Sequence, residues 1–109
     1  VVQHRNHLGV MSTSAISISE TTTTYDFTTT LANTLGESNG ILDLGDGYYA
    51  LYSGDADGSG QVQNTDISPI LTILGTAGYL PGDLDMNGQV QNSDIQNLLQ
   101  PYIGKGEQY

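Results

Sequence analysis

Apolar residues recur at helical spacing in two short stretches of the second half of the chain. The first stretch contains Ile67, Ile70, Leu71 and Leu74, and the second contains Ile95, Leu98 and Leu99. Intervals of three and four residues place such side chains on one face of a helix. Two short helices are therefore predicted. Pro69 requires the first helix to start near Asp66, and Pro101 ends the second.

The first half of the chain shows the alternation of apolar and polar residues that is typical of strands. Every second residue of the opening shares one face if this segment is extended, namely Val2, His4, Asn6, Leu8 and Val10. Ala15–Ser19 alternates in the same way. Nine threonines from Thr13 to Thr34 also favour strands over helices. We therefore expect two extended segments at the start of the chain.

A hairpin and a further short helix are predicted before the second half begins. The sequence ILDLGDGYYALYSGD, which starts at Ile41, has alternating apolar residues on both sides of the turn pair Asp46-Gly47. This pattern predicts a hairpin. The spacing of Phe27, Leu31 and Leu35 is helical, and Gly36 can end a helix there.

Together these elements predict an α+β fold. Residues 1–52 are expected to be mainly β, with an extended N-terminal arm and a small antiparallel sheet or sandwich that includes the hairpin. Residues 53–109 are expected to form two successive loop–helix units. A chain of 109 residues is sufficient for one domain with a modest core.

Each predicted helix follows a copy of the same acidic, glycine-containing segment. GDADGSGQVQNTDI begins at Gly54 and GDLDMNGQVQNSDI begins at Gly82, so each shared residue recurs 28 positions later. Residues at matched positions of a repeat usually have the same structural task. Both copies fit the order of oxygen ligands in a calcium loop of the EF-hand type.

The predicted ligands are side-chain oxygens at loop positions one, three, five and twelve, and the main-chain carbonyl at position seven. They are Asp55, Asp57, Ser59, Gln61 and Asp66 in the first loop, and Asp83, Asp85, Asn87, Gln89 and Asp94 in the second. The glycine at position six of each loop permits the sharp turn. Two calcium ions are therefore expected, each lowering the negative charge of a loop that carries three carboxylates.

Two further expectations concern these loops. Val62 and Val90 point inward at loop position eight and are expected to pair the two loops back to back. The alternative to metal binding is that the acidic residues only form turns and cap the helices, because Asp, Asn and Gly favour such places. Two complete copies at a constant offset favour calcium over this alternative.

Composition narrows the classes of function. The chain has 12 acidic residues against two Lys and Arg, with a formal net charge of −10, which argues against binding to nucleic acid. It contains no cysteine, so disulfides and zinc–thiolate sites are excluded. No apolar run is long enough for a membrane span. The start at Val1 without a visible signal peptide fits a processed chain or an excised fragment.

The segment Ser53–Gly104 resembles a dockerin module, which consists of two calcium loop–helix units without an entering helix. Both loops end in Asp, where the standard EF-hand has Glu. The resemblance implies that the matched residues bind two calcium ions. It also implies a cohesin-like partner, which dockerins often contact through loop positions ten and eleven. Those positions hold Asn64-Thr65 and Asn92-Ser93 here.

The first half has a second resemblance. HRNHLGVMS, YDFTTT and DLGDGYYALYSGD are similar to segments that precede such loops at the C-terminal ends of large secreted surface proteins of Bacteroidota. This resemblance implies an extracellular, cell-surface location.

Other candidate chemistry is weaker. His4, Arg5 and His7 could form a catalytic or metal-binding set, but an extended strand would place His4 opposite the other two, which favours surface or packing roles. Acidic residues outside the repeat have no recognisable catalytic frame, and no G-x-S-x-G is present. We therefore expect a protein that is not an enzyme.

Two hypotheses of function follow. In the first, the protein is a calcium-stabilised structural subunit that joins copies of itself into an extracellular fibre or surface layer. The weakly charged, alternating segment Val1–Ser19 would add to a neighbour's sheet edge, and the basic HRNH end would meet an acidic body. In the second, it is a docking module that tethers a larger secreted protein to a cohesin-like partner.

Overall fold

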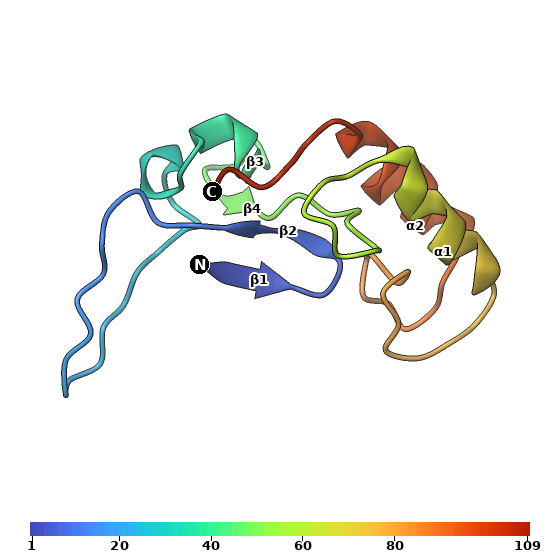
Figure 1. Ribbon diagram of the computed structural model, residues 1–109, viewed down its shortest axis with the longest axis horizontal. Helices are drawn as coiled ribbons and strands as arrows, with labels where there is room; N and C mark the ends of the chain where they lie inside the picture. Colours follow the sequence, from blue (N-terminus) through green and yellow to red (C-terminus); the bar gives the residue numbers. More distant parts are fainter.

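The computed structural model describes residues 1–109 and contains two short antiparallel sheets and two short helices (Figure 1). The strands are β1 (Val2–His4), β2 (His7–Val10), β3 (Leu42–Asp43) and β4 (Tyr49–Ala50), and the helices are α1 (Ile67–Thr72) and α2 (Asn92–Leu98). The expected mixture of strands and helices is confirmed. The strands form two separate two-stranded sheets, β1–β2 and β3–β4, and no sandwich.

The opening segment folds back on itself instead of forming one extended strand. β1 pairs with β2, with Val2 opposite Val10 and His4 opposite His7. The expectation of one continuous face from Val2 to Val10 is therefore wrong, because the chain reverses over two residues after His4. Leu8 and Val10 are buried, whereas Val2 is exposed.

The second hairpin is present where the sequence predicts it. Leu42 lies opposite Ala50, and Asp43 lies opposite Tyr49. The reversal is wider than a two-residue turn and includes Gly45 and Gly47, both with a positive φ (81° and 88°). Glycine adopts this left-handed conformation without steric cost.

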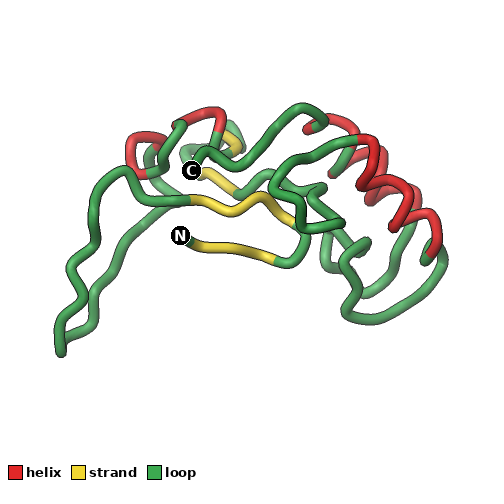
Figure 2. The backbone as a smooth tube through the Cα atoms, in the orientation of Figure 1, coloured by secondary structure: helices red, strands yellow, loops and turns green.

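The predicted helix around Leu31 is reduced to one 3-10 turn, Leu31–Asn33, capped by the side chain of Thr30. Three consecutive threonines precede it, and β-branched residues lose side-chain freedom in a helix. Ala15–Ser19 forms no strand. This segment belongs to a long loop that projects from the body of the molecule (Figure 2).

The two repeat helices follow the sequence closely. α1 starts directly after Asp66, and α2 ends before Pro101, which lies in the 3-10 turn Gln100–Tyr102. Ile70 is completely buried, whereas Leu71 remains 53% exposed. Neither helix has the length and apolar character that crossing a membrane requires.

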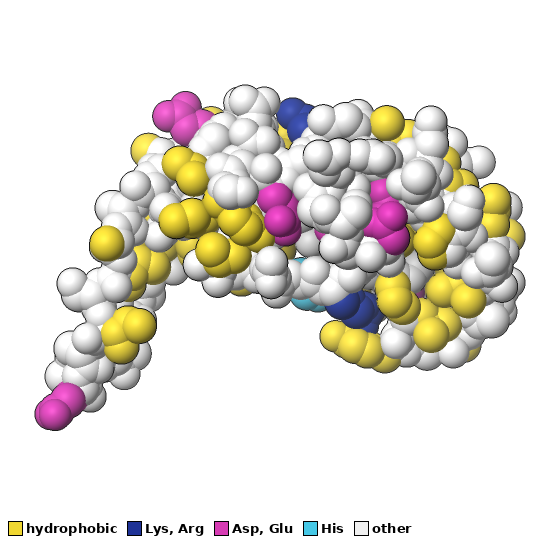
Figure 3. All heavy atoms as spheres, in the orientation of Figure 1, with side chains coloured by type: hydrophobic (Ala, Val, Ile, Leu, Met, Phe, Trp, Pro, Cys, Tyr) yellow, Lys and Arg dark blue, Asp and Glu magenta, His cyan; other side chains and the backbone are white.

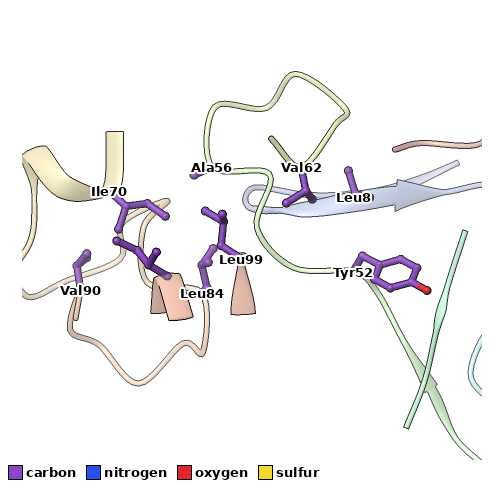
Figure 4. Close-up of a cluster of buried hydrophobic side chains, with 9 residues drawn as sticks. Leu8, Tyr52, Ala56, Val62, Ile70, Leu84, Val90 and Leu99 are labelled. Atoms are coloured by element: carbon purple, nitrogen blue, oxygen red, sulfur yellow. The ribbon is translucent and has the colours of Figure 1, made fainter. Parts of the chain in front are cut away.

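One hydrophobic cluster joins the two halves of the chain. It runs from Val90 and Ile70 on the helical side, through Leu84 and Leu99, to Val62, Leu8 and Tyr52 (Figure 4). Leu8 and Tyr52 lie within residues 1–52, and the others lie within residues 53–109. The N-terminal hairpin is therefore packed on the loop–helix units through side chains that have less than 10% exposure.

The two ends of the chain lie close together beside β1 and β2 (Figure 1). The Gln3 side chain donates a hydrogen bond to the Tyr109 hydroxyl (3.2 Å), and the Gly9 amide donates to Oε1 of Glu107 (3.0 Å). The C-terminal segment is thus hydrogen-bonded to both strands of the β1–β2 hairpin, which contains Leu8.

Candidate metal centre

Each repeat loop brings three carboxylates to one point. In each set the carboxylate oxygens offered for a metal lie within 4.8 Å of one another, and the sets are Asp55, Asp57 and Asp66, and Asp83, Asp85 and Asp94. The first and last member of each set is buried and the middle one is exposed. Two groups of acidic residues that could each hold a metal ion are therefore present.

Burial of these carboxylates is not offset by basic side chains. Asp66 and Asp94 have no exposed surface, and Asp83 has 2%. The only arginine of the chain lies over the Tyr79 ring (3.3 Å to its centroid), and the only lysine lies over the Tyr52 ring (4.9 Å). Buried charges are normally paired or coordinated to a metal. The donor set therefore fits a cation.

Main-chain amides hold the first aspartate of each loop in the same way. Oδ1 of Asp55 accepts from the Ser59 amide (2.9 Å), and Oδ2 accepts from the Gly60 amide (3.1 Å). In the second loop Asp83 accepts from Asn87 (3.0 Å) and from Gly88 (2.9 Å). The repeat thus reproduces the same hydrogen bonds atom by atom.

The glycine at position six has the conformation that the sequence predicts. Gly60 has a φ of 81° and Gly88 a φ of 91°, both in the left-handed region. This conformation turns each glycine amide toward the carboxylate at position one. Gly60 also lies against the Glu107 side chain, which would be 2.9 Å from an added Cβ atom. A side chain at this position would therefore be strained and crowded.

The last aspartate of each loop closes the loop and caps the helix that follows. Oδ2 of Asp66 accepts from the Gln63 amide (2.7 Å), and Oδ2 of Asp94 accepts from the Gln91 amide (2.8 Å). These are the caps that the alternative to metal binding requires. They do not exclude a metal, because each of these two Oδ2 atoms accepts one hydrogen bond and has a second lone pair. The capping and metal-binding roles are compatible.

The electrostatics of the first loop favour a cation. Burial raises the pKa of Asp55 above its ordinary value, and the charges of Asp66 and Asp57 add to this effect, against the hydrogen bonds from the Gly60 and Ser59 amides. The Ser59 side chain lowers the pKa of Asp57. A bound cation would stabilise the charged form of Asp55, which burial disfavours, and would offset its repulsion from Asp66 and Asp57.

The remaining predicted ligands, Ser59, Gln61, Asn87 and Gln89, lie in the same two loops as the carboxylates. Ser59 Oγ donates to the Gln61 carbonyl (3.2 Å), so these two oxygens are adjacent. Asn87 bridges its loop, because its Nδ2 donates to Asp85 Oδ2 (2.9 Å) and its Oδ1 accepts from the Gln89 amide (2.9 Å). Metal binding by these four residues stays a prediction.

The expected pairing of the two loops through Val62 and Val90 is wrong. Val62 donates to the Lys105 carbonyl and accepts from the Gly104 amide (both 2.9 Å). Val90 donates to the Thr76 carbonyl (2.9 Å) and accepts from the Gly75 amide (2.8 Å). Both main-chain groups of each valine are thus used, and the first loop pairs with the segment after α2 while the second pairs with the segment after α1.

Sequence reasoning missed the importance of Asn6. Its side chain is fully buried, and Nδ2 donates to the carbonyls of Pro81 (3.0 Å) and Asp83 (2.9 Å). Its own carbonyl accepts from the Gly54 amide (3.0 Å). Asn6 therefore connects the turn of the first hairpin to the start of both loops. The only sequence signal was an Asn between two strand-like segments.

The structure also brings together a set that the sequence placed apart. Because the chain reverses after His4, the rings of His4 and His7 meet edge to face with centroids 4.7 Å apart. The histidine pair thus forms a third polar cluster, apart from the carboxylates of the two loops. No model of a protein family, no curated protein and no solved structure matches this chain.

Proposed function

We propose that the protein is an extracellular, non-enzymatic structural subunit that binds two calcium ions and joins copies of itself into a fibre or surface layer. The calcium part of this proposal is supported by the two buried carboxylate triads. Their ligands are hard oxygens with no sulfur or imidazole in either loop, which is the set that calcium prefers. The dockerin-like order of ligands points to the same ion.

Assembly is supported by one observation above all, the absence of main-chain pairing in the projecting loop. From Ser14 to Phe27 no main-chain group takes part in a main-chain hydrogen bond and no main-chain amide donates. The only main-chain groups bonded there are four carbonyls that accept from side chains, those of Ser14, Ser17, Thr21 and Asp26. The loop is anchored at its base, where the Thr13 amide donates to the Asn33 carbonyl (3.3 Å). A segment of this kind can form hydrogen bonds with the sheet edge of another molecule.

The composition of this loop suits strand addition. Ile16 is 39% exposed and Ile18 is 95% exposed, and threonines follow at positions 21 to 24. β-Branched residues favour extended pairing. Figure 3 shows the loop as a narrow arm with apolar side chains along it. Complete burial of one isoleucine side chain in a neighbouring molecule would stabilise the contact by about 2 kcal/mol.

The complementary surface in this proposal is the free edge of β1. β2 is covered on its other side, where the Leu8 amide donates to the Tyr52 carbonyl (2.8 Å), whereas β1 pairs only with β2. The projecting loop and the free edge of β1 are different surfaces of the molecule, so the contact between two copies is head-to-tail. Repetition of a head-to-tail contact gives an open fibre when the rotation between copies does not close into a ring. The basic end that the sequence offered for this contact is not free, since Arg5 lies on Tyr79.

The proposal is tested by light scattering and electron microscopy of the chain in calcium, with Ile18→Asp as the disrupting variant. Ile18 contributes almost nothing to the fold, so the variant is expected to melt at the parent temperature but to remain monomeric. Leu44→Asp is the matched control, because Leu44 is also exposed (53%) and lies on the other hairpin. The control is expected to assemble like the parent.

A parent chain that stays monomeric at high concentration with calcium overturns the self-assembly proposal. The docking module is then the better interpretation. One observation favours it specifically, because Leu71 on α1 (53%) and Leu74 in the turn after α1 (40%) are both exposed. Two neighbouring exposed leucines are a suitable contact for another protein.

A further inference from the structure

The turn of the first hairpin gathers three side-chain atoms that can each bind a metal ion. Nδ1 of His4 lies 3.0 Å from Nδ1 of His7 and 3.0 Å from Oδ1 of Asn6. Nδ1 of His7 lies 2.7 Å from the same Oδ1. The three atoms therefore form a small triangle.

The backbone of the hairpin makes this arrangement possible. His4 and His7 are directly opposite each other across the β1–β2 pair, with only two residues between them. Side chains of opposite residues project to the same face of a hairpin. The Arg5 side chain leaves the turn toward the Tyr79 ring, where its charge is held.

The orientation of Asn6 is fixed by groups outside the triangle. Its Nδ2 donates to two carbonyls at the start of the second loop, those of Pro81 and Asp83. An amide whose nitrogen is used in this way must direct its oxygen toward the histidines. Since Asn6 is fully buried, the oxygen is held in place before any ligand arrives.

The protonation of the two imidazoles decides how the three atoms interact. A neutral imidazole has one donor and one acceptor nitrogen, and Oδ1 only accepts. One Nδ1 can donate to the other, and Oδ1 can accept from either or from both, so protons can satisfy these contacts. When neither Nδ1 carries a proton, three lone pairs meet at one place, which is the arrangement that a metal ion stabilises. Burial lowers the pKa of His7 to about 4, and the charges of His4 and Arg5 contribute.

We propose that His4 Nδ1, His7 Nδ1 and Asn6 Oδ1 form a third metal site, separate from the two loops, for a divalent transition ion with tetragonal coordination such as Cu²⁺ or Ni²⁺. Ligand atoms 2.7–3.0 Å apart subtend roughly a right angle at an ion about 2 Å from each. Right angles between nitrogen and oxygen ligands are typical of these ions, whereas tetrahedral zinc needs wider separations.

The site has room for the remaining ligands. A cavity of about 220 Å³ opens in front of the pair and is lined by His4, His7, Ala50, Leu51 and Met86. Figure 3 shows a histidine at the surface on the hollowed underside of the molecule, beside a basic side chain. Water can therefore complete the coordination from this side. The net charge of −10 favours the approach of a cation despite Arg5.

The two kinds of site would select different metals. The loops offer carboxylates and carbonyls, which suit calcium, whereas the hairpin offers imidazole nitrogen, which suits copper and nickel. A test can therefore keep the loops filled with calcium while the hairpin is titrated. The histidines are the only two in the chain, so any imidazole signal comes from this site.

The experiment is a Cu²⁺ titration of the full chain in excess calcium, followed by electron paramagnetic resonance. We expect one tightly bound copper ion with hyperfine coupling from two imidazole nitrogens. His4→Phe and His7→Phe retain an aromatic ring but remove a ligand, and each is expected to weaken copper binding by at least about tenfold. Melting curves in calcium confirm that the variants are folded.

Matched controls separate this site from other copper ligands. Acetylation of the Val1 amine and the variant Glu20→Gln, which lies in the projecting arm, are expected to leave copper binding unchanged. The proposal is overturned if copper stays unbound in the calcium-filled chain. It is equally overturned if the spectrum of the copper-loaded parent chain contains no imidazole coupling. This second outcome is measured on the parent chain and needs no variant. A proton shared between His4 and His7 would then explain their short separation.

Discussion

The two loop–helix units have the same main-chain hydrogen bonds but different surroundings. In both loops the carboxylate at position one accepts from the amides of positions five and six, and the carboxylate at position twelve accepts from the amide of position nine. In the second loop alone, Asp94 Oδ1 accepts from two amides, those of Leu84 (2.8 Å) and Asp85 (3.2 Å). Asp66 Oδ1 accepts from one, that of Asp57 (3.1 Å).

The difference comes from residues that the repeat does not share. The second loop has Asn87 at position five, which makes two hydrogen bonds across the loop, and its first carbonyl is held by Asn6 from the N-terminal hairpin. The first loop has Ser59 at position five, with one hydrogen bond from its hydroxyl. The second loop is therefore better ordered before calcium binds, and we expect it to bind calcium more tightly.

The largest effect should come from removing calcium or a position-one carboxylate. A ligand at a hundredfold excess over its dissociation constant stabilises the native state by about 2.7 kcal/mol per site. EDTA is therefore expected to lower the melting temperature strongly. Asp83→Ala is expected to remove the contribution of the second loop in calcium, whereas Ser59→Ala, which removes only a hydroxyl, should have a smaller effect.

Asp55→Ala is the matched variant in the first loop and should cost less than Asp83→Ala, because the first loop is expected to bind more weakly. All variants should differ less in EDTA than in calcium, since the calcium contribution is then absent. Equal melting temperatures of the parent in calcium and in EDTA would contradict the metal assignment of both loops.

A smaller effect should come from position four, where the loops share a conformation but not a residue. Gly58 has a φ of 71° and Met86 a φ of 59°. The left-handed conformation costs a residue with a side chain about 1 kcal/mol relative to glycine. Alanine is therefore expected to be less stable than glycine by about 1 kcal/mol at both positions. The comparison uses Gly58→Ala against the parent, and Met86→Ala against Met86→Gly.

Chemical denaturation in calcium measures both differences. No atom outside the adjacent residues lies within 4 Å of a Cβ added at Gly58, so backbone strain alone decides the result there. If alanine equals or exceeds glycine at position 86, the second loop does not have the left-handed conformation, and the two loops are less alike than their hydrogen bonds indicate.

The sequence predicted the repeat region well because local signals fix it. Gly60 and Gly88 can take a positive φ, and Pro69 and Pro101 restrict where helices begin and end, without any help from distant residues. The two copies of the repeat also predicted which three carboxylates come together in each loop. These features depend on residues within one loop and its helix, so a pattern of 12 positions contains them.

The arrangement of the two units could not be predicted in this way. Val62 and Val90 are buried and have the expected alternation, but their hydrogen-bond partners, Lys105 and Thr76, lie in segments with no strand pattern. The reversal at Arg5 and Asn6 was equally hidden. The turn contains no glycine. The position of Asn6 is fixed by buried hydrogen bonds to residues more than 70 positions away in the sequence.

The folded hairpin also changes how assembly can be examined. If the opening were a free strand, deletion of Val1–Val10 would leave the body intact. Leu8 and Val10 are instead buried at 1% and 2% exposure, and Asn6 holds both loops. Deletion would therefore disturb the core and the two repeat loops together. Only a change in the projecting loop, residues 14–27, separates assembly from folding.

The smallest expected effect is the one that tests the comparison most directly, exchange of the position-five residues. Ser59→Asn would give the first loop the amide that makes two bonds in the second loop, and Asn87→Ser would remove it there. We expect Ser59→Asn to strengthen calcium binding by the first loop about threefold, or about 0.7 kcal/mol, and Asn87→Ser to weaken the second by a similar factor. The amide resonances of Gly60 and Gly88 report each loop separately, because each amide donates to the position-one carboxylate of its own loop. The double exchange should narrow or reverse the difference in affinity. If the second loop remains tighter by the original factor, position five is not the cause. The features left to distinguish the loops are then the contact of Asn6 with the Asp83 carbonyl and the second amide that donates to Asp94 Oδ1.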